Sequence, residues 1–320
     1  MDPVRTSRLE HLPVTLFGSA MGLSGLSIAY LRADHILGTH LGFGTPLLYA
    51  TSLWFLFLSA AYLLKLLRYP AAVRAEFNHP VRINFFPAWS ISVLLLSIGY
   101  LDPHPTVSRV LWLIGTPLHL IYCLHIMHTW FYREFAIKTM NPAWFIPVVG
   151  TILVPVAGVA HGFREISWFF FSIGTLFWIV LLTIVINRIL FHGNLAAKFL
   201  PTLFILIPPP AVGFIALVKL TGGDGDVQRM FFHLALFFLL LMTSMIGRMV
   251  RVPYYVSWWA YTFPLASITI ASMLMFKLSA MPAYRWLAFG LLGITTLIVL
   301  IVTTSTVRAA RRGEICTPED

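Results

Sequence analysis

Long apolar segments alternate with short polar connections from one end of the chain to the other. An apolar run of about 20 residues is the length that crosses the hydrocarbon core of a bilayer as a helix. Ten such runs are present, so the pattern predicts an all-α integral membrane protein. The ten predicted spans cover residues 13–32, 42–66, 82–101, 109–131, 143–160, 166–188, 199–219, 229–249, 256–277 and 284–306.

The odd-numbered spans share a feature that predicts how the helices are arranged. Each contains a proline or glycine beside a bulky residue, and proline inside a helix removes a hydrogen bond and kinks the chain. Backbone groups freed in this way are tolerated in a membrane only where protein or a water-filled cavity satisfies them. Five kinked helices are therefore expected around a central path. The breaks are Phe17-Gly18, Phe86-Pro87, Ile146-Pro147, Ile207-Pro208 and Phe263-Pro264.

The even-numbered spans are apolar on almost every face, whereas the odd spans carry more hydroxyl and amide side chains. This difference predicts five helical hairpins around a central pore, with the odd helices inside and the even helices outside. A second interpretation stays open, because Ser and Thr also mediate close helix packing in membranes. The polar residues in question are Ser19, Ser24, Asn84, Ser90, Ser92, Thr151, Thr262, Ser267, Thr269 and Ser272.

Composition supports a membrane protein and limits what else the chain can contain. The chain is 58% hydrophobic and 11% charged, with a mean hydropathy of +0.83. Soluble domains carry about 25% charged residues. Ten spans use most of the 320 residues. We therefore expect one membrane domain over 1–320, with short cytoplasmic tails at about 1–11 and 307–320, and no enzyme.

The distribution of Lys and Arg predicts the orientation. Fifteen of these residues fall on the side of both termini and seven fall on the other side. Because cytoplasmic loops carry the excess of positive charge, both termini are expected in the cytoplasm, in a multi-pass protein of the inner (plasma) membrane. The net charge of +10 is spread over short loops, which favours this explanation over nucleic-acid binding. The first span lacks a small-residue cleavage site, so we interpret it as a retained helix rather than a signal peptide.

Charge inside the spans indicates what the central path carries. Every acidic residue falls in a loop, a tail or the edge of a span. Carriers coupled to sodium or protons usually place an ionisable residue near the middle of the membrane. A neutral path with basic residues at the span ends instead favours passive flow of small inorganic anions.

Phe263 is the candidate gate of this path. Pro264 follows it directly, and the resulting kink can turn the aromatic ring toward the axis of the bundle. A ring in a narrow apolar tunnel excludes water and blocks ions. The alternative is ordinary packing, since the chain contains 26 Phe residues.

Histidines raise the possibility of a haem or copper site. His119, His125 and His128 lie in the fourth span near Cys123 and Met127. Such a site needs a histidine on a facing helix, and His233 in the eighth span is the candidate partner. We favour interhelical hydrogen bonding for these side chains and predict no cofactor and no metal. The chain also lacks a P-loop, a dinucleotide-binding fingerprint and hydrolase motifs, and no catalytic residue is predicted.

Two stretches resemble a known family. The sequence VRAEFNHPVRINFF at 73–86 resembles the entrance to the third helix of the SLAC/TehA family, and WWAYTFP at 258–264 resembles its ninth helix. Phe17-Gly18 and Asn141-Pro142 match in kind and order. The resemblance runs from about residue 12 to 306. The family comprises plant slow anion channels, bacterial TehA tellurite-resistance proteins and yeast malate carriers.

The resemblance implies ten helices as five hairpins around one pore per subunit, in a homotrimer. It also implies that Phe263 plugs the pore and that Gly18 lies on its wall. The implied activity is a passive channel for monovalent anions such as nitrate and chloride. The long tails on which plant members are regulated have no counterpart here, so kinase control is not implied. Other candidate pore-lining or kink residues are Phe86, Pro87, Pro147, Pro264 and the run Pro208, Pro209 and Pro210, whose three prolines leave the position that matches helix seven open.

Three other functions stay open at this point. The first is a secondary carrier or exporter of C4-dicarboxylate or tellurite-type anions, which saturable, proton-dependent flux would reveal. The second is the haem or copper redox protein considered above. The third is a purely structural membrane protein, which would show no flux even with Phe263 removed.

Overall fold

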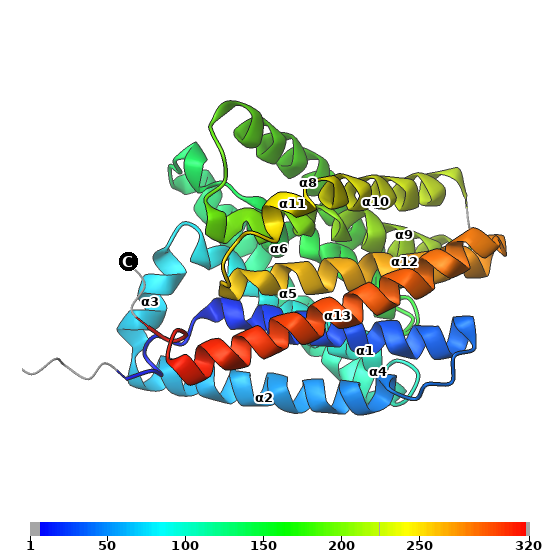
Figure 1. Cartoon of the computed structure of the whole chain (residues 1–320), viewed down its shortest axis with the longest axis horizontal. Coiled ribbons are helices and arrows are strands. Elements are labelled where there is room, and N and C mark those ends of the chain that lie inside the picture. Colours follow the sequence, from blue (N-terminus) through cyan, green and yellow to red (C-terminus); the bar gives the residue numbers. More distant parts are fainter. Residues whose placement is uncertain (1–6, 224, 318–320) are drawn as a thin grey trace, which may run out of the picture.

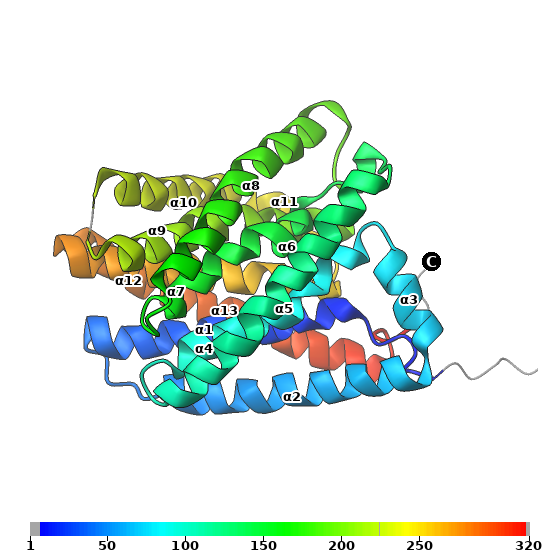
Figure 2. The same cartoon turned by 180° about the vertical axis from the view of Figure 1, so that it is seen from behind.

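A computed structural model describes residues 7–223 and 225–317 of the chain. The described residues form helices joined by short turns, and they contain no strand. Figures 1 and 2 show the long helices running roughly side by side, as expected for a bundle that crosses a bilayer. The fold class predicted from the sequence, an all-α integral membrane protein, is confirmed.

Nine helical segments within the described residues are long and apolar enough to cross a membrane. Four begin with a 3₁₀ segment (η) that is followed at once, or after a single residue, by an α-helix, and five are single α-helices. The composite segments are η1–α1 (Val14–Leu37), η2–α4 (Arg82–Tyr100), η6–α9 (Ala197–Thr221) and η7–α12 (Val256–Ser279). The single helices are α2 (Gly44–Arg68), α5 (Pro105–Tyr132), α8 (Arg164–Phe191), α10 (Asp226–Ser244) and α13 (Pro282–Arg312).

The fifth predicted span is shorter and more broken than the sequence pattern suggested. It covers Pro142–Gly158 and changes between 3₁₀ and α geometry along its length. Prolines and a glycine explain the changes, because proline withholds a backbone donor and glycine weakens a helix. Its four parts are η4 (Pro142–Trp144), α6 (Phe145–Val149), η5 (Gly150–Leu153) and α7 (Val154–Gly158).

Other boundaries also differ from those predicted. The eighth span ends at Ser244 rather than 249, and a separate short helix, α11 (Ile246–Met249), follows it. A further short helix, α3 (Pro70–Asn78), lies in the connection before the third span. The last helix, α13, continues past the expected 306 to Arg312 and ends at a left-handed Gly313. Residues 1–6 and 318–320 of the expected tails lie outside the described residues.

The predicted breaks mark the points where 3₁₀ geometry gives way to an α-helix. Helix α4 begins at Pro87 and α9 begins at Pro208. Proline suits the first position of a helix because its missing N–H would be unpaired there anyway. Carbonyls near the transitions accept hydrogen bonds from hydroxyls, as in Ser19 Oγ to the Leu16 carbonyl at 2.6 Å. The breaks are therefore stable features of the backbone.

Burial separates the helices into two layers that follow the predicted alternation. In the membrane windows of the four composite segments, 67–83% of residues are buried, against 22–39% in the five single helices. Each inner segment packs against the outer helix that follows it in the chain, so that α1 pairs with α2 and α12 pairs with α13. In Figure 1, α2 and α13 lie over the outside of the bundle.

A buried ion pair anchors the start of the first inner segment. Lys65, at the end of α2, and Glu76, in α3, approach to 2.7 Å and are almost completely buried. Lys65 also donates to the Leu12 carbonyl, and Glu76 accepts from the Val14 N–H and from the Tyr62 hydroxyl. Burying an ion pair costs desolvation free energy, which is offset only when the remaining hydrogen-bonding groups find partners, as they do here. The network fixes where η1 enters the bundle.

Candidate functional site

Two cavities lie along the axis of the bundle, and residues of the inner segments line both. The first, here called the apolar cavity, has a volume of about 90 Å³. The early parts of all five inner segments contribute to its wall. Its lining is Thr15, Gly18, Met21, Phe85, Ala88, Ile91, Phe145, Ile146, Val149, Gly150, Ile152, Leu153, Thr202, Ile205, Pro208, Pro209, Val212, Val256, Ser257, Trp259, Ala260, Phe263 and Pro264.

The second cavity, here called the charged cavity, has a volume of about 310 Å³. The later parts of the same inner segments form its wall, because the inner segments all run in one direction. Three basic side chains and one carboxylate belong to the lining, together with His35. Its lining is Gly25, Ile28, Arg32, His35, Ile36, Leu95, Ile98, Asp102, Leu153, Val156, Val212, Ile215, Lys219, Phe263, Ser267, Ile270, Leu274 and Lys277.

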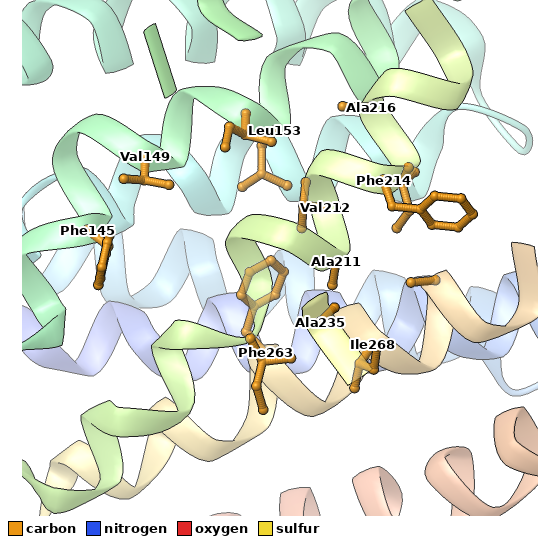
Figure 3. Packing of buried hydrophobic residues seen from close by; sticks show 14 of the residues in the cluster. Phe145, Val149, Leu153, Ala211, Val212, Phe214, Ala216, Ala235, Phe263 and Ile268 are labelled. Atoms are coloured by element: carbon orange, nitrogen blue, oxygen red, sulfur yellow. The ribbon is translucent and has the colours of Figure 1, made fainter. Parts of the chain in front are cut away.

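Three residues belong to the linings of both cavities and so mark the boundary between them. They are Leu153 at the end of η5, Val212 in α9 and Phe263 in α12. Phe263 is only 9% exposed. Figure 3 shows its side chain pointing from α12 toward the segments that carry Val212 and Leu153. An apolar constriction therefore separates the two cavities.

Glycines in α1 allow α12 to bring Phe263 to this position. A Cβ added to Gly25 would lie 2.9 Å from the Ala266 Cβ and 3.2 Å from the Phe263 ring. A Cβ added to Gly22 would lie 2.7 Å from the Thr262 Cβ and still closer to its hydroxyl. Real Cβ contacts are longer than this, so α1 and α12 can approach only because both positions lack a side chain.

Gly22→Ala therefore tests the close approach of α1 to α12. We expect the extra methyl group to push the helices apart and to cost about 1–3 kcal/mol of stability, as overpacking usually does. The measurement is the melting temperature of purified protein in detergent. The matched control is Gly293→Ala in α13, where an added Cβ meets no atom within 4 Å. Equal melting temperatures for the two variants would contradict the close packing.

The structure places the sequence-predicted site residues in two groups. Gly18, Pro208, Pro209 and Pro264 line the apolar cavity together with Phe263. The other four, which are Phe86, Pro87, Pro147 and Pro210, are buried at or near the starts of helices and line neither cavity.

Phe86 shows why adjacent aromatic residues are hard to distinguish in a sequence. Its ring packs at 4.8 Å against Phe77 of α3, edge to face, in a cluster behind α4. The preceding residue, Phe85, lines the apolar cavity instead. In a 3₁₀ turn successive side chains point about a third of a turn apart, so only one of two neighbours can face the axis.

Most hydroxyls of the inner segments serve the helix backbone. Thr262 donates to the Trp259 carbonyl and Ser267 donates to the Pro264 carbonyl, each at 2.7 Å. Of the ten polar residues singled out from the sequence, Ser267 lines one of the two cavities. The hydroxyl content of the inner segments therefore reflects backbone bonding and close packing more than contact with the path.

The histidines of the fourth and eighth spans do not come together. His119 is buried and bonds to Ser90 Oγ at 2.9 Å, whereas His125, His128 and His233 are exposed on outer helices. Among the described residues, no group of three or more His, Cys, Asp or Glu side chains is placed to hold a metal ion. The two cysteines are free thiols in the structure.

Charged side chains lie at one end of the path. Arg32 and Asp102 form an ion pair at 2.9 Å, and Lys219 and Lys277 are exposed at the same cavity. Among the described residues, no charged side chain lines the apolar cavity. The sequence had indicated basic residues at the span ends but not which of them share a cavity.

The comparisons with known proteins agree with this geometry. The model of the SLAC1 family, described as voltage-dependent anion channels, matches residues 11–307. An uncharacterized transporter of Methanocaldococcus jannaschii is 24% identical, covering 97% of this chain and 98% of that protein. The S-type anion channel SLAH2 of Arabidopsis thaliana is 28% identical over 94% of this chain and 60% of its own length. A tellurite resistance protein TehA homolog of Haemophilus influenzae is 27% identical over 80% of this chain and 79% of its own.

Apolar helices in two layers around a line of cavities define a multi-pass membrane protein of the channel and transporter class. Since the family model covers nearly the whole chain, the protein belongs to the SLAC1 family of anion channels. The resemblance predicted from the sequence is thereby confirmed. Small anions and the lipid bilayer are the partners that membership implies.

Proposed function

We propose that this protein is a passive channel for small monovalent anions such as nitrate and chloride. The observation that carries the proposal is the pair of cavities, aligned along the inner segments and separated at Phe263. An ion passing between them would leave one cavity, cross the constriction and enter the other. The outer helices would shield this path from lipid.

Electrostatics favour anions over cations. The charged cavity carries Arg32, Lys219 and Lys277 with a single carboxylate, so it raises the local concentration of anions. In the part of the chain that the structure describes, no carboxylate lines the apolar cavity to hold a cation. This cavity also offers few groups that replace water around an ion, so anions that lose their hydration easily pass best. Weak binding of this kind allows fast release.

Phe263 is the proposed gate. Its buried ring lies where the two cavities meet and points toward the segments that carry Leu153 and Val212. A constriction formed by three apolar side chains excludes water, so an ion that crosses it must lose most of its hydration at a high cost in free energy. Opening would require the ring to move aside.

The alternative is a secondary carrier or exporter of C4-dicarboxylate or tellurite-type anions. It is supported by two relatives, which are named as an uncharacterized transporter and as a tellurite resistance protein TehA homolog. Coupled carriers, however, usually keep an ionisable residue near the middle of the membrane, and here the constriction is apolar. Purified protein in liposomes distinguishes the two. A channel gives nitrate uptake that rises linearly with concentration and ignores a pH gradient, whereas saturable, proton-dependent uptake supports the carrier.

We also propose a membrane location, an orientation and an oligomeric state for the channel. The excess of Lys and Arg near both termini favours cytoplasmic termini in the inner (plasma) membrane, and the family resemblance favours a homotrimer. The mass of the detergent-solubilised protein, measured by light scattering, tests the assembly. Three chains per particle support the trimer and one chain contradicts it.

A further inference from the structure

The charged cavity has more positive charge than a monovalent anion needs. Arg32 in α1, Lys219 in α9 and Lys277 in α12 line it together with Asp102, which follows α4. Lys219 interacts electrostatically with all three of the other charged groups, so each of them lies within range of Lys219. Charged side chains from four different inner segments therefore line the same cavity.

Counting these groups gives the charge that a bound ion would meet. Three cations and one carboxylate leave two positive charges, with His35 taken as neutral. Asp102 is occupied by Arg32 at 2.9 Å, while Lys219 and Lys277 are exposed to the cavity. A nitrate or chloride ion would balance half of this charge, whereas a doubly charged anion would balance it completely.

Size and surroundings allow a doubly charged anion to bind but not to pass. The volume of about 310 Å³ is at the lower end of small-ligand pockets. Beyond the charges, the wall toward Phe263 is formed by apolar side chains such as Ile28, Leu95 and Leu153. The cost of removing an ion from water rises steeply with its charge, so this inner wall stops a dianion far more strongly than a monovalent anion.

We propose that the charged cavity is a binding site for a doubly charged oxyanion, such as sulfate or hydrogen phosphate, which blocks the path from that side. The block would make the flow of monovalent anions depend on the dianion concentration at one face of the membrane. This inference rests on the proposed channel function, but binding of the dianion can be measured without any current.

The first experiment measures block. Patches excised from cells that express Phe263→Ala give all copies one orientation, and sulfate replaces gluconate at constant ionic strength on one face at a time. We expect sulfate to reduce the nitrate current from the face on which the charged cavity opens, with little effect from the other face. When Lys277→Gln is combined with Phe263→Ala, the sulfate concentration that gives half-block should rise about tenfold, because a charge-assisted contact is lost.

Two matched variants test whether the block depends on charge within the cavity. Asp102→Asn removes the single carboxylate and should lower the half-block concentration. Arg285→Gln removes a basic residue at the same end of the bundle that lies outside the cavity, packed over Phe276 and Phe289, and should leave the block unchanged. Equal effects of Lys277→Gln and Arg285→Gln would show general surface charge and overturn the site.

The second experiment measures binding alone. Titration calorimetry of sulfate into purified, unmutated protein should show saturable binding that Lys277→Gln weakens about tenfold. Absence of anion current in a folded Phe263→Ala protein would overturn the channel and leave the binding result to decide on the site. Nitrate current without sulfate block or sulfate binding would overturn the site and leave the channel standing.

Discussion

Phe263→Ala should increase nitrate current by about a hundredfold. Among the described residues, Phe263 provides the only aromatic ring shared by the two cavities, and its loss leaves Leu153 and Val212 facing a wider opening. Water can then enter the constriction, and the ion keeps more of its hydration. A hundredfold rise corresponds to about 2.7 kcal/mol removed from the barrier, within the cost of burying an unpaired polar group.

A control is needed because loss of any buried ring loosens the interior. Phe214 in α9 is fully buried, but it packs against Phe232 at 5.5 Å and lines neither cavity. Phe214→Ala should lower stability without opening the path. The two variants are compared by current per inserted protein in planar bilayers. Equal currents from both, or no gain from Phe263→Ala in protein that is folded and inserted, would remove Phe263 from the role of gate.

Gly18→Asp should reduce anion flux strongly when combined with Phe263→Ala. Gly18 lines the apolar cavity, and a Cβ added there would lie 3.4 Å from the Trp259 Cβ, which is ordinary contact. The Cβ of the new side chain would therefore fit, and its carboxylate would lie at the wall of a space of about 90 Å³ through which the anion must pass. At a separation of ~8 Å and an effective dielectric constant of ~20, the repulsion is about 2 kcal/mol, or roughly a 30-fold loss of current.

Gly18→Asn separates charge from shape, because Asn has nearly the same size as Asp and is neutral. We expect the Asn variant to reduce current much less than the Asp variant. Matching losses from the two would mean that the cavity is simply filled. Full current in the Asp variant would mean that Gly18 is not on the path.

The sequence predicted the helices and their layers because period, length and composition carry that information directly. The breaks at Phe17, Pro87, Pro208 and Phe263 fall where the inner segments change from 3₁₀ to α geometry, because proline and glycine act on the local backbone. For the fifth span, the sequence predicted one kinked helix and missed that it is broken into several short helices. Its prolines and glycine are close enough together to divide a short segment into four pieces.

The composition of the candidate site could be predicted only in part. Leu153 and Val212 meet Phe263 at the constriction, but nothing distinguishes them locally from other aliphatic residues. Gly22 and Gly25 allow α12 to pack closely against α1, and this contact between helices far apart in the sequence is visible only in the structure. A spacing of small residues along the first span was the available signal for them.

The charged groups show the same limit. Glu76 stands in what reads as a polar connection, yet it is buried beside Lys65 because α3 folds back against the end of α2. Arg32, Lys219 and Lys277 lie far apart in the sequence and share a cavity because each ends an inner segment on the same side. The sequence predicted that they lie on the same side of the membrane, but not that they converge on one cavity.

The reversal potential of the Phe263→Ala protein tests the central claim most directly. A planar bilayer separates two potassium nitrate solutions that differ tenfold in concentration, and the voltage at zero current is recorded. The account predicts a value near the nitrate equilibrium potential, about 59 mV in magnitude, and little change when chloride replaces nitrate on both sides. A potential of the opposite sign, at the potassium equilibrium value, would contradict it.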